Sequence, residues 1–282
     1  MPRHGGNEEG TLNSRFAGRS LEEERRSEWW HCTVAAALGL VACSRFPLAT
    51  LPLTADNQIY YYIAERVASG VPPHASEFDV KNALSTMLAG SVIYLGRQVG
   101  VDDIVAVRSL GALTVVGTFS LAWIVTYRLT RSRLAAYAVM LLIIQFRIFL
   151  LLTLMGARPK ALLIPLGLLS ILGVATARPR LFAAGSIASF LTWQPSGLCM
   201  VAGIAAFSVL PDRKTSCRQI LVTYVLVLLA YESYFIWHGI LQDQLYQSMA
   251  AQWRRCDPRD SWIAPRLPWR TRPLPVWHCS GS

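Results

Sequence analysis

The chain has 282 residues, of which 53% are hydrophobic and 16% are charged, and its mean hydropathy is +0.35. This composition is too apolar for a soluble globular protein or a disordered chain, and six cysteines spread over 282 residues exclude a small disulfide-stabilised scaffold. Most of the net charge of +10 lies in short clusters between apolar stretches, a pattern that indicates orientation in a membrane rather than nucleic-acid binding. We therefore predict an all-α integral membrane protein.

Apolar segments of about 20 residues are long enough to cross a bilayer, and shorter segments can do so inside a helix bundle. By this measure the sequence predicts about seven transmembrane helices. They cover approximately residues 30–50, 104–127, 134–155, 161–177, 181–193, 197–210 and 220–237. The fifth and sixth segments are short and could also form one span that is broken at Gln194-Pro195.

Three short basic clusters separate these segments and decide between the two alternatives. Cytoplasmic loops of membrane proteins collect Lys and Arg. All three clusters can face the cytoplasm only if residues 181–210 cross the membrane twice, with the Gln194-Pro195 hinge outside. The clusters consist of Arg128, Arg131 and Arg133, then Arg178 and Arg180, then Arg213, Lys214 and Arg218.

This topology divides the chain into three regions: a cytoplasmic tail over residues 1–29, a membrane core over residues 30–238 and an outer tail over residues 239–282. The core includes an outer loop over residues 51–103. The six arginines in the last 29 residues disagree with an outer location, and one explanation is that the chain is truncated there.

Two amphipathic helices are predicted in the outer loop. The first places Ile59, Ile63 and Val67 on one face and polar side chains on the other, and it ends at Gly70. The second covers approximately residues 80–95 and carries its apolar face on Val80, Leu84, Met87, Leu88 and Leu95. Helices of this kind are typical of a membrane interface, so we expect both to lie flat on the outer leaflet.

The order of motifs in this region resembles that of the GT-C glycosyltransferases, in particular the protein O-mannosyltransferases and the aminoarabinose transferases of lipid A. The resemblance extends over roughly residues 30–250. It depends on Asp56 after the first span, the Tyr-rich helix that closes with Gly70-Val71-Pro72, Lys81 at the head of the next helix, Val107-Arg108-Ser109, Leu191-Thr192-Trp193-Gln194-Pro195-Ser196-Gly197 and Tyr231-Glu232-Ser233-Tyr234.

The resemblance implies a GT-C type core that transfers a sugar from a polyprenyl-phosphate donor, with inversion, at the outer face of a bacterial plasma membrane. The acceptor would be a hydroxyl group of a lipid, a glycan or a protein. Two departures affect the expected site. Many relatives have an acidic pair where this chain has Asp56-Asn57, and many have an Asp at the start of the fourth span, where this chain has Gly156-Ala157-Arg158-Pro159-Lys160.

The leaving group of such a reaction is a lipid phosphate, which fixed cations at the same depth stabilise best. Lys81, Arg158 and Lys160 all fall at the outer ends of segments, and Arg108 lies one turn inside the second span. These four residues are the candidate donor-phosphate ligands. The alternative for Arg158 and Lys160 is that they only extend to the outer headgroups.

Asp56 is the candidate catalytic carboxylate, either as the base for the acceptor hydroxyl or as a ligand of a divalent metal beside it. An Asp directly before a helix is also a common N-cap, which is the structural alternative. Asp102 and Asp103 are candidates for a second carboxylate, although they also fit simple capping of the second span. The sequence leaves the requirement for a metal undetermined.

The main alternative function is a multi-pass lipid or small-molecule transporter, because a helix broken inside the membrane is typical of transporters. An inactive or truncated GT-C relative is a further alternative. No Gly-rich phosphate loop and no metal-binding His or Cys spacing occurs in the sequence.

Overall fold

The computed structural model describes residues 8–47, 50, 52–75, 81–156, 158–209 and 212–250, with the backbone alone for residues 8–25, 55, 249 and 250. Glu77, Asp79, Val80 and residues 251–282 therefore lie outside the described part. The described residues are all-helical. The elements are α1 (Glu8–Ser44), α2 (Ala55–Ala68), α3 (Leu84–Gln98), α4 (Asp103–Thr130), α5 (Arg133–Gln145), α6 (Arg147–Leu154), α7 (Pro159–Ala175), α8 (Pro179–Thr192), η1 (Gln194–Ser196), α9 (Gly197–Ser208), α10 (Arg213–Trp237), α11 (Leu241–Leu245) and η2 (Tyr246–Ala250).

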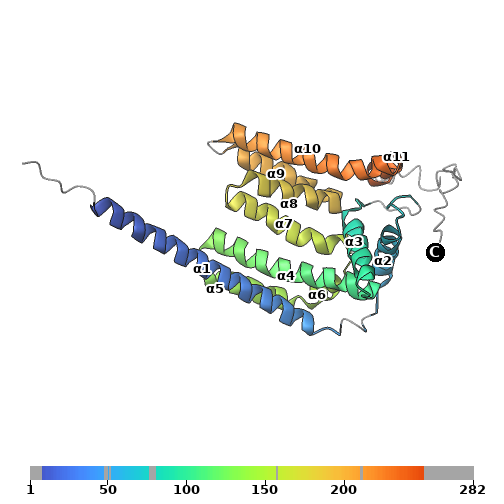
Figure 1. Ribbon diagram of the computed structural model, residues 1–282, viewed down its shortest axis with the longest axis horizontal. Helices are drawn as coiled ribbons and strands as arrows, with labels where there is room; N and C mark the ends of the chain where they lie inside the picture. The colour runs from blue at the N-terminus through green and yellow to red at the C-terminus, as the bar shows by residue number, and fades with distance from the viewer. Residues whose placement is uncertain are drawn as a thin grey trace, which may run out of the picture.

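The long helices lie side by side and run in alternating directions (Figure 1). Helix α4 packs against α1, α5 and α7, and α8 packs against both α7 and α10. The connections α4–α5, α7–α8 and α9–α10 lie at one end of the bundle, which we call the basic end because it carries the three predicted basic clusters. Helices α2 and α3 lie across the opposite end (Figure 1).

Two described helices are long and apolar enough to cross a membrane, namely α4 with 28 residues and α10 with 25 residues. A third candidate is the pair α5 and α6, if the two count as one broken span. Helices α8 and α9 begin and end close to the predicted fifth and sixth spans but have only 14 and 12 residues. Because about 20 residues are needed to span a bilayer, these short helices do not reach that length on their own.

Large apolar side chains cover the outside of the long helices. Leu113 of α4 is 68% exposed, Leu142 of α5 is 70% exposed and Leu198 of α9 is 78% exposed. Soluble proteins rarely expose apolar surface so extensively. Together with the candidate spans, this surface indicates a membrane protein.

The predicted third span is not one straight helix. Helices α5 and α6 meet at Phe146 with a bend of 71°. The break places Arg147 at the first position of α6 and not in the middle of a continuous span. Arg147 stacks its guanidinium over the ring of Phe46, with 5.9 Å between the guanidinium carbon and the ring centroid.

The chain also breaks at Gln194-Pro195, where we predicted a hinge. A single 3₁₀ turn over Gln194–Ser196 separates α8 from α9. The hinge lies at the end of the bundle that carries α3, because α8 runs from the basic end toward it (Figure 1).

Helices α7 and α8 pack closely because small residues lie between them. A Cβ atom at Gly185 would lie 2.6 Å from the backbone nitrogen of Ser170 and 2.9 Å from the carbonyl oxygen of Leu166. Small residues allow helix backbones to approach closely where a membrane removes the hydrophobic driving force between helices.

The two loop helices each bury one face in the protein. In α2, Ile59 is 59% exposed, whereas Tyr60, Ile63 and Ala64 are buried. In α3 the buried face consists of small residues and one isoleucine, namely Ser85, Thr86, Ala89, Gly90, Ile93 and Gly96. The apolar stripes, which were expected to lie on the membrane interface, are partly exposed, because the two helices pack against each other and α3 packs on α4 through small side chains.

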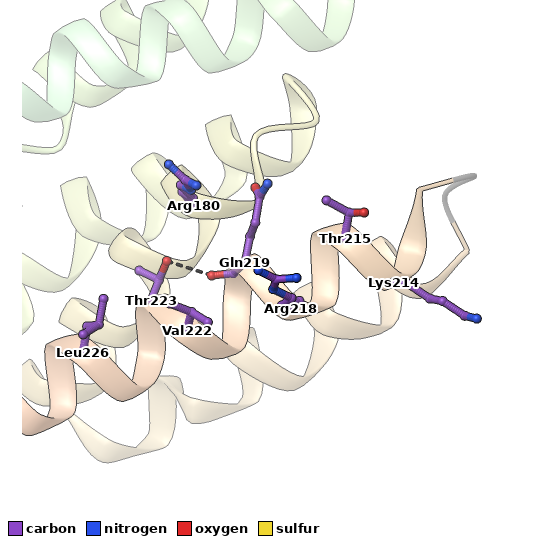
Figure 2. A pocket seen from close by; sticks show the side chains of 8 residues that line it. All are labelled: Arg180, Lys214, Thr215, Arg218, Gln219, Val222, Thr223 and Leu226. Carbon is purple, nitrogen blue, oxygen red and sulfur yellow. Dashed lines mark hydrogen bonds between the residues drawn. The ribbon is translucent and has the colours of Figure 1, made fainter.

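The basic end contains a pocket of about 670 Å³ between α8 and α10 (Figure 2). Its walls include the side chains of Arg180, Lys214 and Arg218. This pocket is separated from the candidate site described next by the length of α8, since Arg180 begins that helix and Trp193 follows its end.

Candidate functional site

Four of the predicted site residues come together at the end of the bundle that carries α2 and α3. They are Asp56, Lys81, Arg158 and Lys160, and they come from α2, the segment before α3, the α6–α7 connection and the start of α7. Arg158 contacts Asp56 directly, and the charges of Asp56, Lys160 and Arg158 all act on Lys81, so we call these four residues the charge cluster.

Asp56 and Arg158 form the central contact of the charge cluster. The Nη2 atom of Arg158 donates a hydrogen bond of 2.7 Å to Oδ2 of Asp56. The side chain of Asp56 remains 64% exposed, whereas that of Arg158 is 21% exposed. The carboxylate is therefore fixed by one partner and still open to solvent.

The structure rejects the N-cap explanation for Asp56. Thr54 occupies the N-cap position of α2, and Asp56 is the second residue of the helix. A carboxylate in the first turn still interacts favourably with the helix dipole, an effect of about 0.3–1 kcal/mol. Neither N-capping nor the interaction with the helix dipole explains why Asp56 contacts Arg158.

Gly156 shapes the connection that carries Arg158. It adopts φ +95°, a conformation that side chains rarely tolerate. A Cβ atom at this position would also collide with the backbone of Val107 in α4. Two residues later Arg158 is the N-cap of α7, and Pro159 starts the helix, a position that proline favours.

Lys81 lies over an aromatic ring at the edge of the charge cluster. Its Nζ is 4.5 Å from the centroid of the Tyr60 ring, a distance at which a cation–π interaction is favourable. Burial lowers the pKa of Lys81; Asp56 opposes this shift, and Lys160 and Arg158 add to it. The charged lysine thus occupies a site that holds more positive than negative charge.

The two residues that follow Lys81 anchor it to the bundle. Asn82 donates a hydrogen bond of 2.7 Å to the carbonyl oxygen of Phe190 in α8. The backbone nitrogen of Ala83 donates to the hydroxyl group of Tyr231 in α10 at 2.9 Å. Lys81 is thereby held in place by two helices that are distant in sequence.

Lys160 is paired with a second aromatic ring. Its Nζ lies 5.3 Å from the centroid of the Trp193 ring, at the end of α8. Sequence analysis identified neither Tyr60 nor Trp193 as a site residue. The only available signals were the Tyr-rich helix and the Trp193-Gln194-Pro195 hinge, and neither pattern shows which cation each ring contacts.

Asn57 is buried beside the cluster, with 2% of its surface exposed. Its Nδ2 atom donates to the hydroxyl oxygen of Thr54 at 2.8 Å and contacts the sulfur of Met155 at 2.7 Å. Its Oδ1 atom is buried and has no donor among the described residues. A buried acceptor without a donor is unusual in a folded protein.

Arg108 differs from the members of the charge cluster in depth. It lies inside α4, and only 4% of its surface is exposed. Asp102 lies at the start of the same helix, one and a half turns before Arg108. Contact between Arg108 and a donor phosphate stays a prediction.

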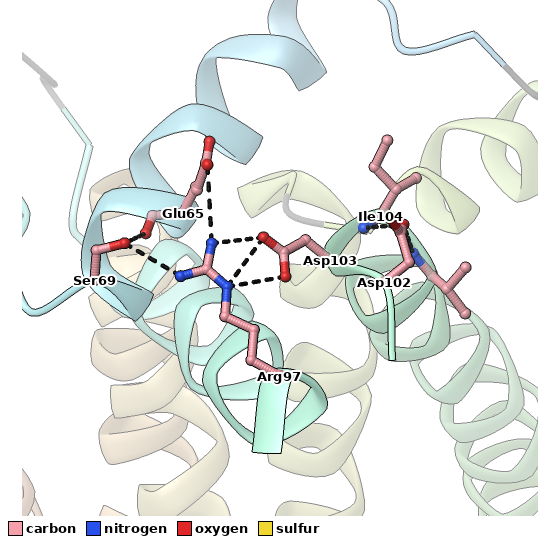
Figure 3. Close-up of polar contacts among 7 residues, drawn as sticks. Glu65, Ser69, Arg97, Asp102, Asp103 and Ile104 are labelled. Atoms are coloured by element: carbon pink, nitrogen blue, oxygen red, sulfur yellow. Dashed lines mark hydrogen bonds and ion pairs between the residues drawn. The ribbon is translucent and has the colours of Figure 1, made fainter. Parts of the chain in front are cut away.

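Asp102 and Asp103 have structural partners (Figure 3). Asp102 is the N-cap of α4 and accepts hydrogen bonds from the backbone nitrogens of Ile104 and Val105. Asp103 binds Arg97 of α3, with a shortest contact of 2.6 Å, and this hydrogen bonding raises the pKa of Arg97. The capping alternative therefore holds for Asp102, and Asp103 joins α4 to α3.

Arg97 extends this contact to α2. Its Nη1 atom donates to the hydroxyl oxygen of Ser69 at 3.2 Å, and its Nη2 atom lies 3.8 Å from a carboxylate oxygen of Glu65 (Figure 3). Of the two acids that were candidates for a second catalytic carboxylate, Asp102 thus caps α4, and Asp103 links α4 through Arg97 to α3 and α2. Asp56 is the only carboxylate that the described contacts place in the charge cluster.

No group of three or more His, Cys, Asp or Glu side chains within the described ranges is arranged to hold a metal ion. The described neighbours of Asp56 are cations, which suit an anionic ligand better than a divalent cation. The charge cluster is accordingly a candidate site for a phosphate or carboxylate group.

A polar network closes the same end of the bundle. Gln194 in the hinge donates a hydrogen bond of 3.0 Å to the carbonyl oxygen of Ser248, and His74 and Gln247 exchange contacts of 3.0 and 3.1 Å. These contacts attach the segment after α10 to the loop between α2 and α3. Sequence analysis did not predict this attachment.

Comparison of the chain with protein-family models, curated protein sequences and solved structures gives no match.

Proposed function

We propose that this protein is a membrane glycosyltransferase of the GT-C type, which transfers a sugar from a polyprenyl-phosphate donor to an acceptor hydroxyl with inversion. One observation carries the proposal: a solvent-accessible carboxylate and three cations from three separate parts of the chain lie together at one end of a helical, membrane-type bundle. The resemblance of the sequence to that family pointed to Asp56 and Lys81, and the position of Arg158 and Lys160 at the outer ends of predicted segments pointed to these two cations.

The charge cluster suits the chemistry of this reaction. Asp56 accepts the proton of the acceptor hydroxyl, the acceptor oxygen bonds to the anomeric carbon, and the bond from that carbon to the phosphate oxygen breaks. The phosphate leaves with the electron pair. Lys81, Arg158 and Lys160 then stabilise the charge that develops on it.

The contact between Arg158 and Asp56 gives this scheme a specific feature. A donor phosphate offers the guanidinium of Arg158 the same bidentate geometry as a carboxylate. Arg158 can therefore exchange Asp56 for the donor, and the released carboxylate is left beside the acceptor. Binding of the donor phosphate to Arg158 would therefore also release Asp56 to act as the base.

The proposal includes sidedness: the charge cluster faces the outside of a bacterial plasma membrane, the three basic clusters face the cytoplasm and the chain crosses seven times. Two exposed positions at opposite ends test it, Pro195 in the hinge and Lys214 at the start of α10. In a cysteine-free background within intact cells, a membrane-impermeant thiol reagent should modify Pro195→Cys and leave Lys214→Cys unmodified. Equal protection of both, or labelling of Lys214→Cys alone, would contradict this orientation.

Catalysis is tested with membranes that contain the full-length protein and a panel of undecaprenyl-phosphate-linked sugars, namely mannose, glucose and aminoarabinose. Transfer to endogenous lipid, glycan or protein acceptors is measured with labelled sugar and normalised to protein level. Asp56→Asn should lower transfer by about 100-fold or more, the usual contribution of general acid–base catalysis. Asp103, whose carboxylate is bound to Arg97, provides the matched control, and Asp103→Asn should retain transfer.

Transport of a lipid or small molecule is the second candidate function, and the break between α5 and α6 favours it. Broken helices inside a membrane often surround a transported solute. At this break Arg45, Phe46 and Arg147 border a pocket of about 290 Å³. Flux of a lipid-linked sugar across vesicles that is abolished by Arg147→Gln but not by Asp56→Asn would favour transport over transfer.

A further inference from the structure

The pocket at the basic end lies between two helices and is lined by three cations (Figure 2). Arg180 comes from the second position of α8, and Lys214 and Arg218 come from the first two turns of α10. The pocket has a volume of about 670 Å³. That volume lies within the range of about 300–1,000 Å³ that is usual for small-molecule sites.

None of these three cations forms an ion pair with another residue in the described part of the chain. Elsewhere at the basic end Arg128 is neutralised by Glu28 at 2.6 Å. The pocket thus concentrates positive charge that no described acidic residue balances. An anionic ligand is the natural complement of such a site.

The face of α10 that lines the pocket changes from polar to apolar along its length. Arg218, Val222 and Leu226 recur at four-residue spacing and therefore share one face of the helix. Val222 is 49% exposed and Leu226 is 61% exposed. Gln219 contributes a further polar group at the level of Arg218.

The polar group closest to this apolar part is already satisfied. The hydroxyl group of Thr223 donates a hydrogen bond of 2.8 Å to the backbone carbonyl of Gln219, as Figure 2 shows. In the part of the pocket lined by Val222, Thr223 and Leu226, the one described hydroxyl group therefore already donates a hydrogen bond. A ligand that suits the wall has an anionic head and an apolar body directly beneath it.

We propose that this pocket binds the phosphate headgroup of an anionic phospholipid, with an acyl chain along Val222 and Leu226. Basic pockets between transmembrane helices are known to bind such headgroups at the cytoplasmic side of membranes. Among the described helices, α10 is long and apolar enough to span the bilayer, so its first turns lie at the depth of the headgroups. The proposal does not depend on glycosyl transfer.

The test uses purified full-length protein in a mild, uncharged detergent, titrated with phosphatidylglycerol or phosphatidylcholine of the same chain length. Binding is followed by native mass spectrometry. Arg180→Gln/Arg218→Gln removes two pocket cations, and Arg178→Gln/Arg213→Gln removes two charges from the same connections without lining the pocket. All four arginines are exposed, so both variants should fold, which a thermal unfolding curve checks.

Phosphatidylglycerol should bind in preference to phosphatidylcholine. The pocket variant should bind it about thirtyfold more weakly, since each of the two removed basic residues contributes roughly 1 kcal/mol at such a surface. The control variant should change binding less than twofold. Equal losses in both variants would show a diffuse basic surface and overturn the proposal. Competition by millimolar inorganic phosphate would also overturn it, because the ligand would then be a free anion and not a lipid.

Discussion

Arg158 and Asp56 are 102 residues apart in the chain, and Arg158 Nη2 donates a 2.7 Å hydrogen bond to Asp56 Oδ2. This contact joins a candidate phosphate ligand to the candidate base. It also links α2 to the start of α7, which are separated in sequence by α3, α4 and the broken pair α5–α6.

Removal of Arg158 should affect function far more than stability. The carboxylate of Asp56 is 64% exposed, and ion pairs at exposed groups contribute at most about 1 kcal/mol. Arg158→Ala should therefore change the free energy of unfolding by less than that, whereas the KM for the lipid-linked donor should rise at least tenfold. Thermal unfolding in detergent and transfer kinetics measure the two effects.

Arg158→Lys provides the control, because it keeps the charge but loses the planar fork that binds phosphate or carboxylate. The KM of Arg158→Lys for the lipid-linked donor should lie between those of the wild type and Arg158→Ala. If Arg158→Ala lowered stability by several kcal/mol and left the KM unchanged, Arg158 would be a structural residue only.

Lys81 should make stability depend on alkaline pH. Burial lowers its pKa in the folded protein, so the unfolded chain binds more protons between the lowered pKa and the ordinary lysine value. The charged side chain costs stability below the lowered pKa, and this cost disappears as the pH rises through that interval. Wild-type protein should therefore gain stability relative to Lys81→Met as the pH is raised from 7.5 toward 10.5, the ordinary lysine pKa.

Unfolding temperatures of both proteins across this pH range provide the measurement. Lys214→Met, an exposed lysine at the basic end, is the control and should run parallel to the wild type. A constant difference between wild type and Lys81→Met at every pH would contradict the burial of Lys81.

Asp102 and Asp103 should respond to substitution as structural residues. Asp102→Ala removes the N-cap of α4 and should cost about 1 kcal/mol, whereas Asp102→Asn caps about equally well and should be almost neutral. Asp103→Asn should weaken the contact with Arg97 by no more than about 1 kcal/mol, and less at high salt. Chemical denaturation at low and high salt separates these effects, and loss of transfer in Asp102→Asn with unchanged stability would restore Asp102 as a catalytic candidate.

Gly185 should be intolerant of any side chain. A Cβ atom there would lie 2.6 Å from the backbone nitrogen of Ser170, which cannot move away without separating α7 from α8. Gly185→Ala should therefore destabilise the protein by about 1–3 kcal/mol, as overpacked cores do. The measurement is the unfolding temperature in detergent.

Gly167→Ala in α7 is the matched control, because a Cβ atom at Gly167 meets nothing within 4 Å. Helix propensity alone should make this variant more stable by about 0.5–1 kcal/mol. Equal effects of the two substitutions would show that α7 and α8 are not closely packed at Gly185.

The sequence alone was sufficient for the approximate positions of α4, α7, α8 and α9, but it did not predict the break between α5 and α6. Runs of apolar side chains, Pro159, Pro179 and the Gln194-Pro195 hinge mark the helix boundaries locally, and the structure has α7, α8 and α9 within a few residues of them. Composition was also sufficient to indicate a membrane protein, because so much apolar surface cannot be exposed to water.

Residue spacing could not predict which helix faces are buried or which charges meet. The spacing groups Ile59 with Ile63 on one apolar face of α2, but Ile63 is buried and Ile59 is exposed, because α2 packs Tyr60 and Ala64 against neighbouring helices. Likewise, the partner of Asp103 depends on how α3 docks on α4, and the partner of Asp56 depends on the α6–α7 connection, where Gly156 turns the chain against Val107. Helix periodicity is a local property, whereas these contacts join segments that are distant in sequence, so only the tertiary structure decides them.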